Sequence, residues 1–512
     1  MDINLLFSTI RFLKPTQILW QLKNRLIHPK YYQFSTPVHQ TCELLESPIP
    51  RNICFRNEIF TFLNITQAFD GWNNDANGNL YTYNINYFDY INSGALLKED
   101  ACKWIDQFIT EVENVSLGLD PYPIALRSIN WIKFFSQHPD CINENRDSAL
   151  WSQLCLLEKK LEYHLLGNHL LEDAFSLFIA SIYFNDERMY HRYSKLLGSE
   201  LREQILCDGA HYEQSPMYHC ILLDRLLDCC NFSFSNPRFE NQNLMNDCLK
   251  HYASLMLGHL DSIIYANGDI PLLNDSANAI APTTYQLFDY AGRLGIEWER
   301  KPLYECGYRH WRINDKEVII DIGNITASYQ PGHTHADTFN YEMRISGKPF
   351  IVDTGISTYE KNSRRQYERS TVAHNTVSVG NCNSSEVWGG FRVGKRANVE
   401  VYIDSDNHIS ASHNGFVGIR CKRDFVNDQR GFVVTETLSK HVKAESFIHL
   451  GPDVQIKEAS KDKVLTSLGV IEVYNAERLE VVDEFVSTEY NKLTPIKKII
   501  ISFTENMQYI IK

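Results

Sequence analysis

The sequence of 512 residues contains no run of about 20 apolar residues, so it predicts no transmembrane helix. Its first apolar stretch includes an arginine and a lysine and lacks a small-residue cleavage site, which is not the pattern of a signal peptide. The 13 cysteines form no CxxC pair, and scattered cysteines in odd number are typical of buried thiols rather than disulfides. Together these absences predict a cytoplasmic protein.

Positive charge is also in short supply, because 50 Lys and Arg stand against 63 Asp and Glu and leave a net charge of -13. Proteins that bind the phosphate backbone are usually basic, so nucleic acid is not an expected partner. An acidic protein can still bind an acidic sugar through a local basic cleft. Aromatic residues make up 12% of the chain, and some of them can stack on sugar faces, although most are expected in the core.

Residues 1–60 read as an N-terminal preface of short helices and proline-marked turns. Within this preface, residues 19–25 form an amphipathic stretch that is able to touch a membrane surface or a partner. Docking of the stretch onto its own chain is the simpler interpretation. The preface therefore leaves a peripheral membrane association open.

Residues 61–305 carry apolar residues at spacings of three and four, as in WSQLCLLEKKLEYHLL at 151–166. Short links join these segments, which predicts stacked antiparallel helical hairpins in a solenoid or a closed toroid. No repeat of fixed period is visible, and this argues against a regular solenoid.

Residues 306–512 consist of short β-branched segments bounded by Gly, Asn and Asp, such as GFVVTETL at 431–438. This texture predicts an antiparallel β-sandwich. Because the helices come first and the strands second, the chain is expected to be an α+β multidomain protein rather than an alternating α/β protein.

Two motifs in the helical part contain residues able to do chemistry. In GNHLLEDAF, Gly167 is expected to end one helix and Asn168 and His169 to open the next, where Asn168 alone could be a simple N-cap. In DGAHYEQSPMYH, Ser215 is the expected N-cap, with Tyr218 in the first helical turn. Taken alone, Asn168 and Tyr218 are each more simply explained as structural residues.

A third motif, GHTHADTFNYEMRISGKPFIVDTG at 332–355, places His333 and His335 two residues apart. In a strand both would face the same side. With Asp353 and the later His374, these histidines offer a ligand set suited to zinc. Histidines hydrogen-bonded at a domain interface are the equally simple alternative.

Basic and aromatic residues near these motifs are candidates for substrate binding. Arg365, Arg369 and Tyr359 lie between VDTG and AHNTV, the two segments that carry Asp353 and His374. Arg127 in DPYPIALRSINWI is a candidate for the helical side of a cleft, and Glu213 is expected to be structural.

Taken together, GNHLLEDA, YEQSPMYH, GHTHADTFNYE with VDTG, and AHNTV resemble the heparinase II/III family of polysaccharide lyases, including its alginate-lyase relatives. The resemblance implies an incomplete (α/α) toroid followed by antiparallel β-sheets. It also implies metal binding by His335, Asp353 and His374, with the metal fixing the sheet near the cleft. The N-terminal preface resembles that of members associated with surface-polysaccharide biosynthesis.

The implied reaction is β-elimination from a uronic acid linked through O4. Removing the C5 proton requires donors on the carboxylate, a base at C5 and an acid at O4. Asn168 suits a carboxylate donor, and His169 suits a base or a second donor. Tyr218 suits the acid, or the base if nearby cations lower its pKa, while His333 would close the cleft from the sheet side. A uronate C5-epimerase and a non-catalytic glycan-binding component of an assembly system remain as alternatives.

Overall fold

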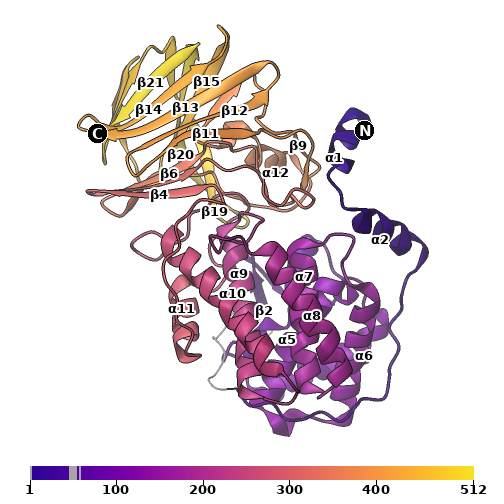
Figure 1. Cartoon of the computed structure of the whole chain (residues 1–512). Helices are drawn as coiled ribbons and strands as arrows, with labels where there is room; N and C mark the ends of the chain where they lie inside the picture. Colours follow the sequence, from indigo (N-terminus) through magenta and orange to yellow (C-terminus); the bar gives the residue numbers. More distant parts are fainter. Residues whose placement is uncertain (1–2, 45–54, 57–58) are drawn as a thin grey trace.

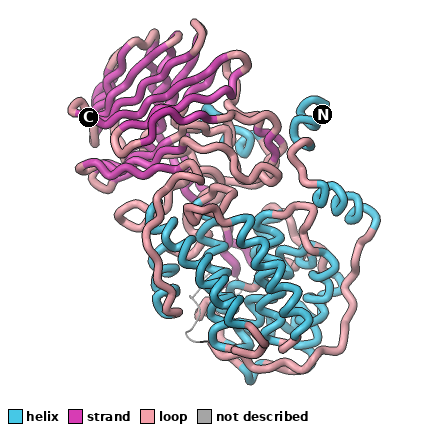
Figure 2. Tube along the Cα trace, in the orientation of Figure 1, coloured by secondary structure: helices cyan, strands magenta, loops and turns pink. Residues whose placement is uncertain are grey.

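The computed structural model describes residues 3–44, 55–56 and 59–512. Most helices gather in one half of the molecule and most strands in the other (Figures 1 and 2). The N-terminal helix lies beside the sheet half, and the rest of the chain forms the helical half first and the sheet half second (Figure 1). The expected α+β architecture, a helical toroid followed by antiparallel sheets, is confirmed. No helix in the described part of the chain is long and apolar enough to cross a bilayer.

The helical domain is built from antiparallel neighbours joined by short links (Figure 1). The helices of the described residues are α1 (Ile3–Ile10), α2 (Pro15–Leu26), α3 (Asn79–Tyr87), α4 (Lys98–Glu111), α5 (Pro121–Gln137), α6 (Glu144–Lys160), α7 (Gly167–Tyr183), α8 (Glu187–Gln204), α9 (Pro216–Ser235), α10 (Gln242–Ile263), α11 (Thr284–Arg293) and α12 (Ser363–Glu368). The last of these belongs to the sheet domain.

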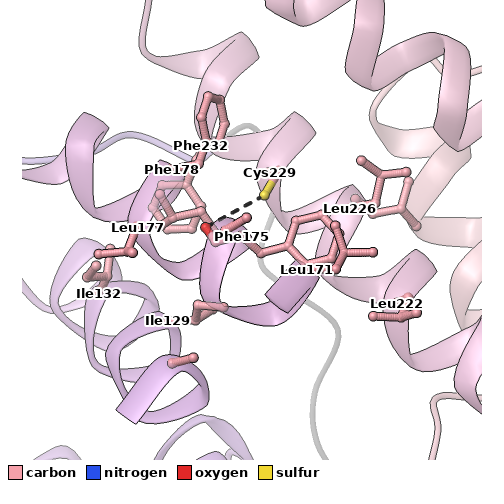
Figure 3. Close-up of a cluster of buried hydrophobic side chains, with 14 of the residues drawn as sticks. Ile129, Ile132, Leu171, Phe175, Leu177, Phe178, Leu222, Leu226, Cys229 and Phe232 are labelled. Carbon is pink, nitrogen blue, oxygen red and sulfur yellow. Dashed lines mark hydrogen bonds between the residues drawn. The ribbon is translucent and has the colours of Figure 1, made fainter. Parts of the chain in front are cut away.

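Helix α7 forms the centre of the helical core. Every residue from 170 to 183 is buried, so this helix is enclosed around its whole circumference rather than along one stripe. Figure 3 shows Leu171 and Phe175 of α7 packed with Ile129 of α5 and Leu226 of α9. Because α7 is enclosed on all sides, its N-terminus is held at a fixed place in the domain.

The sheet domain contains three larger antiparallel sheets. The first is β4 (Tyr308–Ile313), β5 (Lys316–Asp321), β6 (Tyr341–Ile345) and β7 (Lys348–Ile351). The second has the order β19 (Arg478–Glu489), β20 (Lys492–Thr504), β15 (Lys443–His449) and β8 (Val377–Val379). The third has the order β11 (Val399–Asp404), β12 (His408–Phe416), β13 (Ile419–Asp428), β14 (Gly431–Leu438), β21 (Asn506–Ile511), β18 (Val470–Tyr474), β17 (Lys463–Thr466) and β16 (Ile456–Ala459).

These sheets share one apolar core. In β14 the expected segment 431–438 is found, and its Phe432 pairs with Ile511 of β21. Tyr341 of β6 lies 5.7 Å from Phe432, ring centre to ring centre, which places two sheets face to face. Two smaller sheets complete the described strands. One pairs β9 (Val387–Trp388) with β10 (Arg392–Val393), and the other contains β1 (Phe55–Arg56), β2 (Ile59–Phe62) and β3 (Ile65–Ala68).

The N-terminal segment touches both domains. In α2 the buried Gln17 donates its amide to the carbonyl oxygens of Leu165, at 3.0 Å, and Tyr329, at 3.2 Å. The helix therefore docks onto its own chain, as the simpler interpretation expected. On its other side Leu19 and Leu22 are exposed, and the chain then runs along the outside of the helical domain (Figure 1).

Candidate active site

The candidate site lies where the two domains meet, and every part of it comes from a loop or a helix end. The N-terminus of α7 and the loop before α9 supply the helical side. The loop between β5 and β6 and the region around α12 supply the sheet side. A third loop, between α10 and α11, brings Asp275 between them, and its backbone N–H donates to the carbonyl oxygen of His333 at 3.2 Å.

Asn168 and Glu213 form the helical side of the site. The backbone N–H of Asn168 donates to Glu213 Oε1 at 2.9 Å, and Asn168 Nδ2 donates to Glu213 Oε2 at 2.7 Å. Both residues are buried. Asn168 is therefore not a helix cap, because the N-cap position belongs to Leu166 and the Asn168 side chain binds another loop.

Gly167 opens α7 instead of ending α6, which corrects the expected boundary. Its φ is +61°, in the left-handed region that favours glycine. A Cβ atom at this position would lie 2.3 Å from Glu213 Oε1. The glycine is thus required for the close approach of the Glu213 carboxylate to the helix N-terminus, where the backbone N–H groups favour a negative charge.

His333 faces this pair from the sheet domain. Its Nδ1 lies 2.9 Å from Asp275 Oδ2, while its Nε2 lies 3.2 Å from Asn168 Nδ2 and 3.3 Å from Glu213 Oε2. Because Asp275 is an acceptor, the network assigns the hydrogen to Nδ1 and leaves the Nε2 lone pair directed at the Asn168 amide. The arrangement orients the imidazole with Nε2 toward the helical domain.

The HxH segment is a loop and not a strand, so that expectation is wrong. Residues 322–340 connect β5 and β6 and contain no strand. His333 and His335 still converge, because both bind Asp275: His335 Nε2 lies 2.8 Å from Oδ1. Burial alone would raise the pKa of Asp275, but the Arg365 guanidinium and these imidazoles hold that pKa well below its usual range.

Tyr218 covers the exposed side of His333. The expected cap is confirmed, since the Ser215 hydroxyl accepts from the Tyr218 N–H at 3.2 Å and Pro216 begins α9. The Tyr218 ring stacks on the His333 ring with 3.8 Å between centres, and its hydroxyl accepts from the Tyr359 hydroxyl at 3.2 Å. Burial raises the pKa of Tyr218, so the side chain is a phenol at neutral pH.

His169 follows Asn168 in α7, and its side chain is partly exposed. Its Nδ1 is 3.0 Å from Glu162 Oε2, and its ring is 5.0 Å from that of Tyr122, centre to centre. Burial opposes charging of His169, but the carboxylates of Glu162, Glu213 and Glu172 together raise the pKa of His169. The imidazole of His169 is therefore more readily protonated than that of a free histidine.

The predicted arginines do not lie free in a cleft. Arg365 binds both carboxylate oxygens of Asp275, Nη2 to Oδ2 at 2.7 Å, and both residues are fully buried. Arg369 donates to the Thr334 carbonyl oxygen at 2.8 Å, which braces the histidine loop. These two residues support the site from behind instead of facing a sugar.

Arg127 is not brought to this site. It is 1% exposed and lies in α5, where Nε donates to Gln153 Oε1 at 2.6 Å and Nη1 donates to the Asn86 carbonyl oxygen at 3.0 Å. Burial lowers the pKa of this guanidinium to about 9. The side chain faces the helical core, so the expected direct contact with a substrate has no support here.

The predicted metal ligands are neighbours, but His374 is bound to Asp353 while His335 is bound to Asp275. His374 Nδ1 lies 2.7 Å from Asp353 Oδ2, and the rings of His335 and His374 are 5.2 Å apart. His335 Nδ1 and His374 Nε2 are buried without a hydrogen-bond partner, which suits a metal between them. Asp353 lies behind His374, in the position of a residue that orients a ligand.

Asp275 and Glu162 were not predicted from the sequence, and Glu213 was assigned only a structural role. Asp275 lies in the polar stretch NDS after an apolar segment, with nothing local to mark it as the partner of two histidines and an arginine. Its role depends on contacts with residues at least 58 positions away in the sequence.

Comparison with known proteins gives two matching family models. Residues 153–302 match the heparinase II/III N-terminus, and residues 296–512 match the heparinase II/III-like C-terminal domain. The chain belongs to the heparinase II/III family. The two matches together span the site described above and all of the larger sheets.

Curated relatives of this family member include a heparin-sulfate lyase from Pedobacter heparinus, 24% identical over 377 residues, which are 64% of this chain and 54% of the relative. A heparin-sulfate lyase from Bacteroides thetaiotaomicron is 22% identical over 310 residues, covering 52% of this chain and 44% of the relative. The chain thus spans about half the length of these curated relatives.

Solved structures agree on the fold. The crystal structure of heparinase III superimposes with a TM-score of 0.62 at 14% identity, covering 83% of this chain and 75% of that one. A heparan sulfate lyase from Pedobacter heparinus gives a TM-score of 0.55 at 16% identity, covering 97% and 87%. At these identities the likeness supports the toroid and sandwich architecture alone.

Proposed function

We propose that this heparinase II/III family member is a polysaccharide lyase that cleaves a uronic-acid-containing glycan by β-elimination. The observation that carries the proposal is the convergence of Asn168, Tyr218 and His333 from three distant segments. Asn168 Nδ2 lies 3.2 Å from His333 Nε2, and the Tyr218 ring stacks on the imidazole ring at 3.8 Å. An amide donor, a phenol and an oriented imidazole are the groups that the reaction needs.

Neutralisation of the substrate carboxylate is assigned to Asn168 and His169. Asn168 Nδ2 carries two hydrogens, of which one binds Glu213 and the other faces His333 Nε2. A carboxylate entering beside Asn168 can take the second hydrogen in place of His333. His169, favoured in its charged form by Glu162, supplies a further donor on the same helix end.

His333 is then free to act as the base at C5. Loss of the Asn168 hydrogen bond exposes the Nε2 lone pair, while Asp275 keeps Nδ1 protonated and stabilises the imidazolium that forms. Tyr218 donates its phenolic proton to the leaving O4 atom, and its hydroxyl has Tyr359 as a hydrogen-bond neighbour. The C5 proton leaves to His333, the C4–O4 bond breaks, and a C4–C5 double bond forms.

A metal at His335 and His374 fits this proposal, because both histidines have a buried nitrogen without a partner. Burial lowers the pKa of His335 to about 4, so its imidazole is neutral and can bind a cation. Zinc bound by these two histidines, with Asp353 orienting His374, would supply no step of the reaction. It would fix the histidine loop against the strand that follows His374.

The test is to incubate the purified protein with a panel of uronate glycans and to follow the ultraviolet absorbance of the unsaturated product. A lyase produces this absorbance and new chain ends together. A uronate C5-epimerase would exchange the C5 proton with deuterated water without new absorbance. A non-catalytic glycan-binding component would bind a glycan and do neither.

A further inference from the structure

A separate cluster of metal-ligating side chains lies beneath the loop that leads to α9. Asp208, His259 and Cys306 each offer one ligand atom, and these atoms all lie within 4.8 Å of one another. Among the described residues, no other three His, Cys, Asp or Glu side chains meet this spacing. Their exposed fractions are 1%, 4% and 0%. The cluster is therefore closed to solvent.

The chain brings these residues together by a close approach of two backbones. Gly209 follows Asp208 in a tight turn with φ +82°, and a Cβ atom at Gly209 would lie 2.1 Å from the Leu255 carbonyl oxygen of α10. The same Cβ would lie 3.2 Å from the Cβ of His259. Only glycine allows the loop to rest on α10 at the turn that carries His259.

The third ligand comes from the link between the domains. Asp208 Oδ2 accepts from the backbone N–H groups of Tyr304, at 3.2 Å, and Cys306, at 2.9 Å. These bonds draw the start of the sheet domain onto the helical domain. They also hold the carboxylate in place from behind, as outer-shell hydrogen bonds do for metal ligands.

The ligand atoms have capacity left for a cation. His259 Nδ1 is buried without a hydrogen-bond partner, so its lone pair is available to a cation. Cys306 Sγ accepts from the Tyr308 backbone N–H at 3.4 Å, a contact that stabilises a thiolate.

We propose that Asp208, His259 and Cys306 bind a structural divalent metal, with zinc as the expected ion. Sulfur, nitrogen and oxygen ligands in a buried site suit zinc, and ligand atoms on a tetrahedral zinc are roughly 3.5 Å apart. Binding releases the thiol proton to solvent. The thiolate and the carboxylate then balance the two positive charges, and the imidazole stays neutral.

Such a metal would fasten three segments: the loop after α8, helix α10 and the link to β4. The loop after α8 continues to Glu213 and to the cap residue Ser215, so the metal would fix the helical side of the candidate active site. The proposal does not rest on the lyase assignment. It concerns which residues hold a metal, whatever glycan the protein acts on.

The experiment uses the full chain, purified without chelators or metal-affinity resin, with metal content measured by mass spectrometry. The protein is also prepared with cobalt in place of zinc, because a cysteine ligand gives a thiolate-to-cobalt charge-transfer band in the near ultraviolet. The variants are Cys306→Ala and, as the matched control, Cys421→Ala, another buried cysteine that lies in β13. His374→Ala reports on the other candidate site, which has no sulfur ligand.

We expect the parent protein to hold about one equivalent of zinc at this site, in addition to any metal that His374→Ala loses. We also expect a charge-transfer band in the cobalt form of the parent protein. Both should be absent from Cys306→Ala and present in Cys421→Ala and His374→Ala. A parent protein whose cobalt form lacks the band overturns the proposal, even if Cys306→Ala does not fold. A band that persists in Cys306→Ala overturns it equally.

Discussion

Glu213 receives two hydrogen bonds from one residue, the backbone N–H of Asn168 at 2.9 Å and its side-chain Nδ2 at 2.7 Å. This pair joins the N-terminus of α7 to the loop that leads into α9. It also fixes the orientation of the amide, because the carboxylate accepts only from nitrogen. Glu213 therefore turns the amide donor of Asn168 toward His333, and the substrate need not contact Glu213.

Reversing the polarity of this pair separates the contribution of Asn168 to stability from its contribution to turnover. Asn168→Asp sets two buried carboxylates against each other, so we expect a loss of unfolding free energy of about 1–3 kcal/mol and loss of turnover. The double variant Asn168→Asp with Glu213→Gln restores a hydrogen bond, because the introduced glutamine amide donates to the introduced carboxylate. It should recover most of the stability, measured by urea unfolding. Turnover should stay about 10²–10³-fold below that of the parent, because the carboxylate donor is still missing. Recovery of turnover with stability would show that Asn168 is only structural.

Tyr218→Phe removes the proposed acid and keeps the ring that stacks on His333. We expect turnover to fall by about 10²–10⁴-fold, with the thermal unfolding temperature and glycan binding nearly unchanged. Tyr359→Phe is the matched control, since it removes the hydroxyl that donates to Tyr218 and leaves the acid in place. Near-parental turnover of Tyr218→Phe would remove this residue from the mechanism.

The pH dependence of activity should report on His169. Because its folded pKa is raised, its charged form persists above the reference value of about 6.5 and is lost as the pH rises through the folded pKa. The stabilising effect of its pairing with Glu162 is complete below about 6.5 and is lost over the same window. Glu162→Gln should shift the alkaline fall of kcat/KM to lower pH. Glu158→Gln, a glutamate that binds Tyr193 instead, should leave it in place. An unshifted profile in Glu162→Gln would exclude charged His169 as the carboxylate donor.

Arg365 should behave as a support for Asp275 and not as a sugar ligand. Arg365→Met leaves the buried Asp275 carboxylate without its cation, and removing one partner of a buried pair costs about 3–5 kcal/mol of unfolding free energy. Arg364→Met is the control, since its guanidinium is partly exposed and binds Glu368. Urea unfolding of both variants measures the difference. A raised KM with parental stability in Arg365→Met would instead favour direct substrate contact.

Much of the fold could be predicted from local pattern. The β-branched segment at 431–438 matches β14, and the Ser215–Pro216 pair marks the start of α9. The apolar spacing at 151–166 predicts the second half of α6, but the helix ends at Lys160 and residues 161–166 are not helical. What could not be predicted depends on contacts between distant segments. His333 and His335 share a direction because both bind Asp275, not because they lie in a strand.

Contacts between distant segments also explain why the structure places the arginines and Gly167 differently from the predictions. An arginine in a loop carries no mark of whether it meets a buried carboxylate, as Arg365 does, or solvent. Gly167 looks like a helix end until the Glu213 carboxylate is placed against it. A cytoplasmic location and zinc at His335, Asp353 and His374 stay predictions.

The central claim is tested most directly by product analysis on a panel of uronate glycans, with the parent protein and Tyr218→Phe measured side by side. The account predicts that one glycan gives rising ultraviolet absorbance and oligosaccharides with a C4–C5 double bond at the new non-reducing end. It also predicts that Tyr218→Phe gives neither at a comparable rate. Cleavage that yields saturated ends, or deuterium exchange at C5 without new chain ends, would contradict it.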